Sequence, residues 1–316
     1  MVRCREIRTD DIEHVVHLLA RGFTDDRRFQ DHGARARYWV NAIKRLETHP
    51  TPPGLPRYGY CLDMGERLVG VVLLSFAAID GSFRCNVSSW YVDPDFRVYA
   101  AILALRATKN KDAIFFNLSP APNTWEILER QGFVSYAHGR FIAVPALSRA
   151  PPGVRTLPYA PDVRSGPDLS QSEIDMLRDH AALGCMSLVC TDGMTRHPFV
   201  FGLRVRGRAL PIVRLIHCRN VDSFVRFAGV LGRYLLGRGY PFVVTDAEGP
   251  IAGLVGRYKQ GSQRYWKGPR PMRLGDMAYS EIVMFDYNKV KWNEHDDNLT
   301  VSKVPLVTKM LAAGAP

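Results

Sequence analysis

The sequence predicts an α/β protein of the α+β type, built from two domains. Its 316 residues are about twice the ~150 residues of a common domain. A proline-rich segment, Ser148–Gly153 with three further prolines close behind, can hold neither a helix nor a central strand. Helix-like and strand-like segments follow in a similar order on both sides of it. We therefore expect a first domain at 1–150, a second at 151–290 and a polar C-terminal tail at 291–316.

Composition narrows the class of protein. Apolar residues make up 46% and charged residues 23%, the balance of a soluble globular chain. No uncharged apolar run reaches the ~18 residues of a membrane span, and the N-terminus lacks the apolar stretch of a secretory signal. A collagen, a coiled coil, a disordered chain and an integral membrane protein are excluded. Six cysteines without a C-x-x-C pair favour buried, reduced thiols, so we expect a cytoplasmic protein without a metal site.

Ten elements are expected in the first half, in the order β-α-α-β-β-β-α-β-α-β. Apolar residues at 12, 15, 16, 19 and 23 have helical spacing, and Gly65-Glu66 separates two alternating runs as a hairpin turn does. Asp93-Pro94 ends a strand, and apolar residues from 100 to 105 begin the next helix. The expected strands are 2–8, 58–64, 67–77, 84–92, 113–118 and 133–144, and the expected helices are 10–23, 34–46, 100–105 and 123–130.

The second half repeats this order in outline, which suggests a tandem duplication. Ser170 and Glu173 form a capping box that opens a helix, and Arg206–Arg208 is a hairpin turn between two apolar strands. Asp222 caps a further helix. Later elements are expected as a strand at 242–245, a short helix at 251–258 and a last strand at 277–285.

The segment Ser88–Arg97 carries the most functional information. It reads S-S-W-Y-V-D-P-D-F-R, so a strand ends at V-x-P-x-x-R and leads into a helix. Free amides in the first turn of a helix, together with the positive end of its dipole, can bind a pyrophosphate. The pattern therefore predicts an anion site after this strand.

This segment resembles the GNAT acyltransferase superfamily, whose members bind acetyl-CoA or another acyl-CoA at this place. The resemblance continues in Asn123–Phe133, which is similar to that family's late helix ending in Gly-Phe. It implies two GNAT-like domains, each with a central mixed, mostly antiparallel sheet flanked by helices. It also implies acyl-CoA as a substrate and no metal.

The resemblance assigns the cofactor contacts residue by residue. The backbone of Trp90 and Val92 would pair with the pantetheine arm, and Asn123 would contact the CoA arm from the late helix. The remaining expected contacts lie in the pyrophosphate loop, at Arg97, Val98, Tyr99 and Ala100.

Three departures from the family pattern concern catalysis. The pyrophosphate loop has no glycine, and Leu128 stands where the family often has a tyrosine that acts as general acid. The strand 84–92 offers no carboxylate to act as general base. A primary ammonium must lose a proton before it attacks a thioester. Ser89 and Tyr91 could line the groove, and Tyr136 or His138 could reach the acyl end. Each of these could equally be a hydrogen-bonded core or rim residue.

Other polar residues admit a functional and a structural interpretation. His217 lies beside Cys218, but adjacent strand residues face opposite sides, so the two cannot form a dyad. Asp246 and Glu248 follow an apolar strand, where α/β folds often place functional groups, or they belong to a turn. Six cations between Arg257 and Arg273, mixed with aromatic residues, could bind nucleic acid or a CoA phosphate, or form a solvated hairpin.

The function implied by the resemblance is transfer of an acyl group from CoA to an amine or hydroxyl, by direct attack on the thioester. Backbone amides of the strand would stabilise the oxyanion. The alternative is a non-catalytic GNAT-fold binding or sensor protein for CoA or an anionic partner. We expect a small-molecule acceptor, and neither a membrane nor a nucleic acid as partner. The acceptor, the acyl chain length and the oligomeric state stay open.

Overall fold

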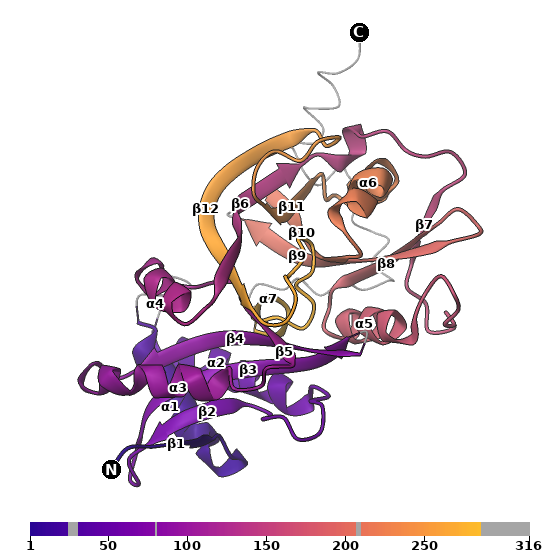
Figure 1. Ribbon diagram of the computed structural model, residues 1–316. Coiled ribbons are helices and arrows are strands. Elements are labelled where there is room, and N and C mark those ends of the chain that lie inside the picture. Colours follow the sequence, from indigo (N-terminus) through magenta and orange to yellow (C-terminus); the bar gives the residue numbers. More distant parts are fainter. Residues whose placement is uncertain (25–30, 80, 207–209, 286–316) are drawn as a thin grey trace. The chain divides into compact units, whose positions relative to one another are not determined.

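The computed structural model describes residues 1–24, 31–79, 81–206 and 210–285 (Figure 1). Residue contacts divide the chain into two compact units, neither of which is continuous in sequence. The described part of unit 1 comprises residues 1–136, 263–272 and 279–285, and that of unit 2 comprises 137–262 and 273–278. The boundary expected near residue 150 therefore lies within unit 2, and the division at 150 stays a prediction. The expected tail at 291–316 and most of the hairpin turn at 206–208 lie outside the described residues.

Unit 1 is a sheet with the strand order β1-β2-β3-β4-β5-β12. All neighbours are antiparallel except β4 and β5, which are parallel. Its strands are β1 (Arg3–Glu6), β2 (Gly59–Asp63), β3 (Leu68–Ile79), β4 (Ser82–Val92), β5 (Ala113–Asn117) and the end of β12 (Gly256–Lys267). Its helices are α1 (Ile12–Gly22), α2 (His32–Thr48), α3 (Ala100–Ala107), α4 (Trp125–Arg130) and α7 (Glu281–Met284).

Unit 2 has the same topology, with the strand order β7-β8-β9-β10-β11-β6 and one parallel pair, β10 and β11. Its strands are β7 (Arg155–Pro158), β8 (Met186–Thr191), β9 (Arg196–Arg206), β10 (Leu210–Cys218), β11 (Phe242–Ala247) and most of β6 (Val134–Ala143). Its helices α5 (Gln171–Ala182) and α6 (Val221–Leu236) lie on opposite faces of the strands (Figure 1). The repeated order confirms the predicted fold class, a mixed, mostly antiparallel sheet flanked by helices.

The closing strands are exchanged between the two units. β6 follows α4 of unit 1 in the chain, but its residues 139–143 pair with β11 of unit 2. β12 follows β11 in the chain, but its residues 265–267 pair with β5 of unit 1. Unit 1 is therefore complete only when residues far beyond the first 136 are present.

The core of unit 1 shows which side chains of β4 lie on each face of its sheet. Cys85 and Val87 of β4 belong to a buried cluster that includes Leu103 of α3, Leu128 of α4 and Tyr265 of β12. Because side chains alternate along a strand, Asn86 and Ser88 lie on the opposite face. Val15, Val16 and Leu19 of α1 are buried as the apolar spacing predicted, whereas Ile12 is half-buried.

Two expected elements of the second half are wrong, and two strands were missed. Sequence reasoning missed β7 and β8, and the expected helix at 251–258 is instead a loop leading into β12. The basic aromatic segment is a strand over 256–267 and not a hairpin, with Arg264 and Tyr265 1% and 0% exposed, whereas its cations at 257, 259, 270 and 273 are exposed. Backbone pairing outweighs the polar composition of this strand. The expected strand at 277–285 also fails, because Tyr279 has a left-handed φ of 55° and Glu281 begins α7.

None of the helices in the described segments has the length and apolar character needed to cross a bilayer.

Candidate functional site

The last part of β4 separates from its parallel neighbour. β4 and β5 pair as far as Asn86 and Phe116, after which β4 continues to Val92 paired with β3. A bulge interrupts the β3 ladder here, and within it Ser89 has a φ of 53°, unusual for a residue other than glycine. Within the described segments, no strand pairs with the other edge of residues 87–92. We call this the open edge of β4, and its backbone groups can pair with an amide-bearing ligand.

The segment after β4 differs from the expected helix start. Residues Pro94–Tyr99 form a 3-10 turn, and α3 begins only at Ala100. The amide of Phe96 donates to Asp93 O at 2.9 Å, and that of Ala100 donates to Arg97 O. Part of the expected anion-binding amides is therefore used within the turn. Without glycine, the residues follow the tight right-handed turn available to ordinary residues.

Most of the expected cofactor contacts are brought together by the core of unit 1. Val92 belongs to the buried cluster, and Trp90, Tyr99 and Ala100 pack against it. Trp125, at the start of α4, packs against the same cluster. The open edge, the turn and the start of α4 therefore all pack against the same buried cluster.

The other expected residues lie in more exposed or more distant parts of the chain. Arg97 and Val98 are exposed in the turn, and Asn123 is exposed in the 3-10 turn Pro122–Thr124 before α4. Tyr136 is buried in the unit 1 part of β6, whereas His138 is exposed in its unit 2 part.

Tyr91 is fixed against the end of α1. A Cβ at Gly22 would lie 2.6 Å from the Tyr91 ring, so this close approach requires glycine. Phe23 lies beside the ring at 6.1 Å between centroids, and Asp93 forms an ion pair with Arg21 at 2.8 Å. Burial, and after it the neighbouring Asp93, raises the pKa of Tyr91. The phenol therefore stays protonated and can donate a hydrogen bond.

A carboxylate that sequence reasoning missed lies where β4 and β5 separate. Glu281 donates its backbone amide to Asn86 Oδ1 at 2.6 Å, and Asn86 Nδ2 donates to Phe116 O at 3.1 Å. Ser119, just past β5, donates its hydroxyl to Glu281 Oε1 at 2.5 Å. The one feature of the sequence that could have indicated this contact is Asn86, a polar residue in an apolar strand. Asn86 is fully buried, and a buried polar side chain needs a hydrogen-bond partner.

A second tyrosine hydroxyl lies on the α4 side of the sheet. Leu128, at the family's tyrosine position, is buried in the core. The neighbouring Glu129 receives a hydrogen bond of 2.7 Å from the Tyr265 hydroxyl, which comes from β12. Burial, followed by the effect of Glu129, raises the pKa of Tyr265. Tyr265 is thus a neutral, buried hydroxyl whose hydrogen bond is taken up within unit 1.

Unit 2 has the corresponding parted strands, but its own chain covers the edge. β10 and β11 pair as far as Arg214 and Val244, and a bulge follows between Leu215 and His217. The amide of Cys218 donates to Gly275 O at 2.8 Å, and that of Met277 donates to Ile216 O at 2.7 Å. Residues 273–278, here called the covering segment, therefore occupy in unit 2 the edge that is open in unit 1.

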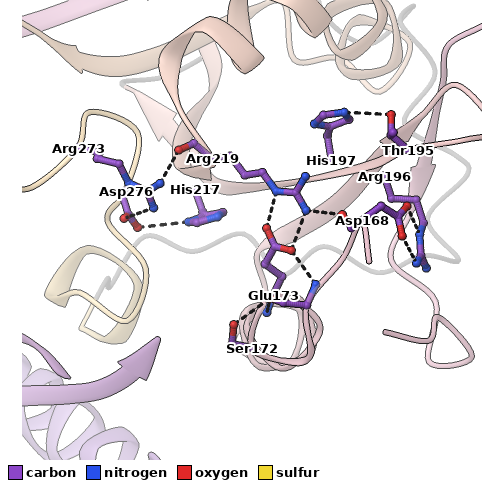
Figure 2. Close-up of polar contacts among 11 residues, drawn as sticks. Asp168, Ser172, Glu173, Thr195, Arg196, His197, His217, Arg219, Arg273 and Asp276 are labelled. Carbon is purple, nitrogen blue, oxygen red and sulfur yellow. Dashed lines mark hydrogen bonds and ion pairs between the residues drawn. The ribbon is translucent and has the colours of Figure 1, made fainter. Parts of the chain in front are cut away.

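Hydrogen bonds and ion pairs of polar side chains hold the covering segment against β10 (Figure 2). His217 Nδ1 lies 3.3 Å from Asp276, which also pairs with Arg273 at 3.1 Å. Arg273 donates to the carbonyl of Arg219 at 2.8 Å. Gly275 has a φ of 73°, and a Cβ there would lie 2.5 Å from Cys218 Sγ, so the segment requires glycine.

The remaining polar candidates of unit 2 lie apart from the covering segment's hydrogen bonds or are poorly suited to catalysis. Burial raises the pKa of Cys218 to about 12, so its thiol is a poor nucleophile. Asp246 is not part of a turn: it is buried in β11 and forms an ion pair with Arg214 at 2.7 Å. Glu248 is exposed after β11. Among the residues that the structure describes, no group of three or more His, Cys, Asp or Glu side chains could hold a metal.

Comparison with solved structures identifies the fold. The chain is similar to a GCN5-related N-acetyltransferase from Kribbella flavida, with 13% identity over 84% of this chain and 70% of that one and a TM-score of 0.50. A GCN5-related N-acetyltransferase from Anabaena variabilis matches with 13% identity over 84% and 72% of the two chains and a TM-score of 0.49. Eis1 from Mycobacterium abscessus matches with 10% identity over 87% and 74% and a TM-score of 0.43.

No family model and no curated protein matches the sequence. The fold is that of the GCN5-related N-acetyltransferases, as the motifs around Val92 and Asn123 predicted.

Proposed function

We propose that the chain is an acyl-CoA-dependent acyltransferase whose donor site is the open edge of β4 in unit 1. The observation that carries the proposal is the contrast between the units. In unit 2 the backbone at Ile216 and Cys218 pairs with a peptide segment. Counted back from the last residue of each strand, Cys218 in β10 and Val92 in β4, the matching residues in unit 1 are Trp90 and Val92, next to the bulge. A pantetheine arm carries amides, and it can make there the bonds that the covering segment makes in unit 2.

The residues around this edge have distinct roles in the proposal. Trp90 and Val92 pair with the pantetheine arm, and the exposed guanidinium of Arg97 binds a CoA phosphate. Val98 is 78% exposed and Ile102 is 49% exposed, so both offer apolar contact area in front of α3. Tyr99 and Ala100 hold the turn, and Asn123 contacts the CoA arm from the other side.

The chemistry proceeds by direct attack of the acceptor on the thioester. Backbone amides near the bulge stabilise the oxyanion. Tyr91 is a protonated hydroxyl that can donate a hydrogen bond to the departing sulfur, and Ser89 and Tyr136 are further candidates in unit 1.

One observation favours the alternative of a non-catalytic CoA-binding or sensor protein. The 3-10 turn uses amides of Phe96 and Ala100 that a pyrophosphate would otherwise receive. The alternative predicts that CoA binds and that no acyl group is transferred to any acceptor.

The donor site is tested by CoA binding to Arg97→Ala, with Arg3→Ala as the matched control. Arg3 is also an exposed arginine of unit 1, in β1. A charge-assisted hydrogen bond contributes about 1.5–3 kcal/mol, so Arg97→Ala should weaken CoA binding by roughly 10- to 150-fold. Arg3→Ala should leave the dissociation constant unchanged. Equal affinities for the two variants would remove this edge as the donor site.

A further inference from the structure

α3 has apolar side chains on its outer side as well as on its buried side. Leu103 belongs to the buried cluster of unit 1. On the outer side Ile102 is 49% exposed and Leu105 is 64% exposed, and Val98 in the preceding turn is 78% exposed. Their spacing of four and three residues makes them neighbours on one helix face. A surface helix usually has polar residues on that face, and apolar side chains exposed together are typical of an interaction site.

The charged residues within this stretch are all cations. Residues 96–111 contain four cations, all of them exposed, and no acidic residue. These are Arg97, Arg106, Lys109 and Lys111. Asp95 and Asp112 lie just outside the stretch, and exposed Arg67 lies over the ring of Phe96, 5.7 Å from its centroid. We call the four cations and the three exposed apolar residues the α3 surface. It fits a partner that is acidic overall and apolar in part.

The α3 surface begins where the open edge of β4 ends. Val92 is the last residue of β4, and Arg97 lies in the 3-10 turn that leads from there to α3. The amides of Phe96 and Ala100 bond to carbonyls within this turn. The turn therefore offers an exposed guanidinium to one phosphate, but fewer amides to a pyrophosphate.

We propose that the α3 surface binds a small acidic acyl carrier protein, which presents its acyl group to the open edge on a phosphopantetheine arm. The proposal rests on the proposed function and adds a second donor to it. CoA and the carrier share the pantetheine thioester, so either arm can pair with Trp90 and Val92. The carrier has a single phosphate between its arm and a serine, which Arg97 can bind. Its acidic surface then covers apolar residues and cations that lie beyond that phosphate.

The transfer itself is the same with either donor. The nucleophilic atom of the acceptor bonds to the thioester carbonyl carbon, and the C–S bond breaks with its electron pair on sulfur. The sulfur takes up a proton to balance the one that the acceptor loses. The carrier leaves with a free thiol on its arm, as CoA does.

The test measures binding of the full chain to acetyl-CoA and to a bacterial type II acyl carrier protein. The carrier is used in its acetylated form and in the apo form, which lacks the arm. Leu105→Ser/Lys109→Glu changes one apolar and one cationic residue of the α3 surface. Val40→Ser/Lys44→Glu is the matched control, because it makes the same change at the same spacing on α2, where Val40 is 37% exposed and Lys44 is exposed.

Leu105→Ser/Lys109→Glu should bind the acetylated carrier roughly 10- to 100-fold more weakly, the loss typical of contact residues in an interface. It should bind acetyl-CoA with unchanged affinity, which also shows that the variant is folded. The control should bind both donors as the unsubstituted chain does. Arg97→Ala should weaken binding of acetyl-CoA and of the acetylated carrier but not of the apo carrier, which has no arm phosphate. Binding of the carrier should weaken as salt is added.

Three results would overturn the proposal while leaving the acyl-CoA site in place. These are equal carrier affinities in the α3 variant and its control, acetyl-CoA binding without carrier binding, and an equal loss of acetyl-CoA affinity in the α3 variant. Binding to vesicles of anionic phospholipid that the α3 variant loses, without carrier binding, would assign the surface to a membrane instead. Failure of the unsubstituted chain to bind either donor would refute the proposed function itself, and this proposal with it.

Discussion

Asn86→Ala probes the connection that places Glu281. The substitution removes the acceptor of the Glu281 amide and the donor to Phe116 O. Leaving a buried polar group unpaired costs about 1–3 kcal/mol, so two groups give roughly 2–6 kcal/mol. Glu281 is half-buried and water can reach its amide, so we expect the lower half of this range, about 2–4 kcal/mol of unfolding free energy. This is a large part of the 5–15 kcal/mol typical of a folded domain.

The assay is urea unfolding, followed by circular dichroism, of Asn86→Ala and the control Asn110→Ala. Asn110 also accepts a hydrogen bond from a backbone amide, that of Asp112 at 2.9 Å, but in an exposed turn. We expect a loss below about 1 kcal/mol for the control, because water replaces the lost partner. A loss as small for Asn86→Ala would show that Asn86 does not join β5 to the Glu281 segment.

Further predictions concern the exchanged strand, a surface ion pair and the thiols. Residues 1–150 expressed alone should show no cooperative unfolding transition, because β5 would lack β12 and the core would lack Tyr265; a sharp two-state transition would contradict this. Arg196 lowers the pKa of Asp168 to about 2, below its unfolded value of ~3.9, so the stability it adds above pH ~4 should be lost as pH falls toward 2. Arg196→Ala should flatten this part of the urea-midpoint profile, and an unchanged slope would refute the assignment. In thiol labelling at pH 8, half-buried Cys4 should react first and the five buried cysteines only on unfolding; early labelling of Cys218 would contradict its burial.

Local patterns were enough to predict most of unit 1. The apolar spacing of α1, the turn at Gly65-Glu66 and the stop at Asp93-Pro94 act over a few residues, and the elements they predicted are present. The anion motif likewise identified the end of β4. The absence of glycine from the loop indicated a departure from the family pattern. In the structure this loop is a 3-10 turn between β4 and α3.

Contacts between distant residues explain what the sequence could not show. Glu281 and Asn86 are 195 positions apart, and no local pattern brings them together. β12 is rich in cations, yet it is a sheet strand, and β5 supplies the backbone partners of its last three residues, Tyr265–Lys267. The covering segment of unit 2 depends in the same way on Gly275 fitting beside Cys218. In each of these cases, contacts between distant residues determine the local structure, and the local composition does not predict it.

The most direct test of the central claim is a calorimetric titration of the full chain with acetyl-CoA. The account predicts saturable binding of one molecule per chain, because the edge of unit 1 is open and that of unit 2 is covered by residues 273–278. No heat of binding at millimolar acetyl-CoA, or a site that Arg97→Ala leaves unchanged, would contradict it.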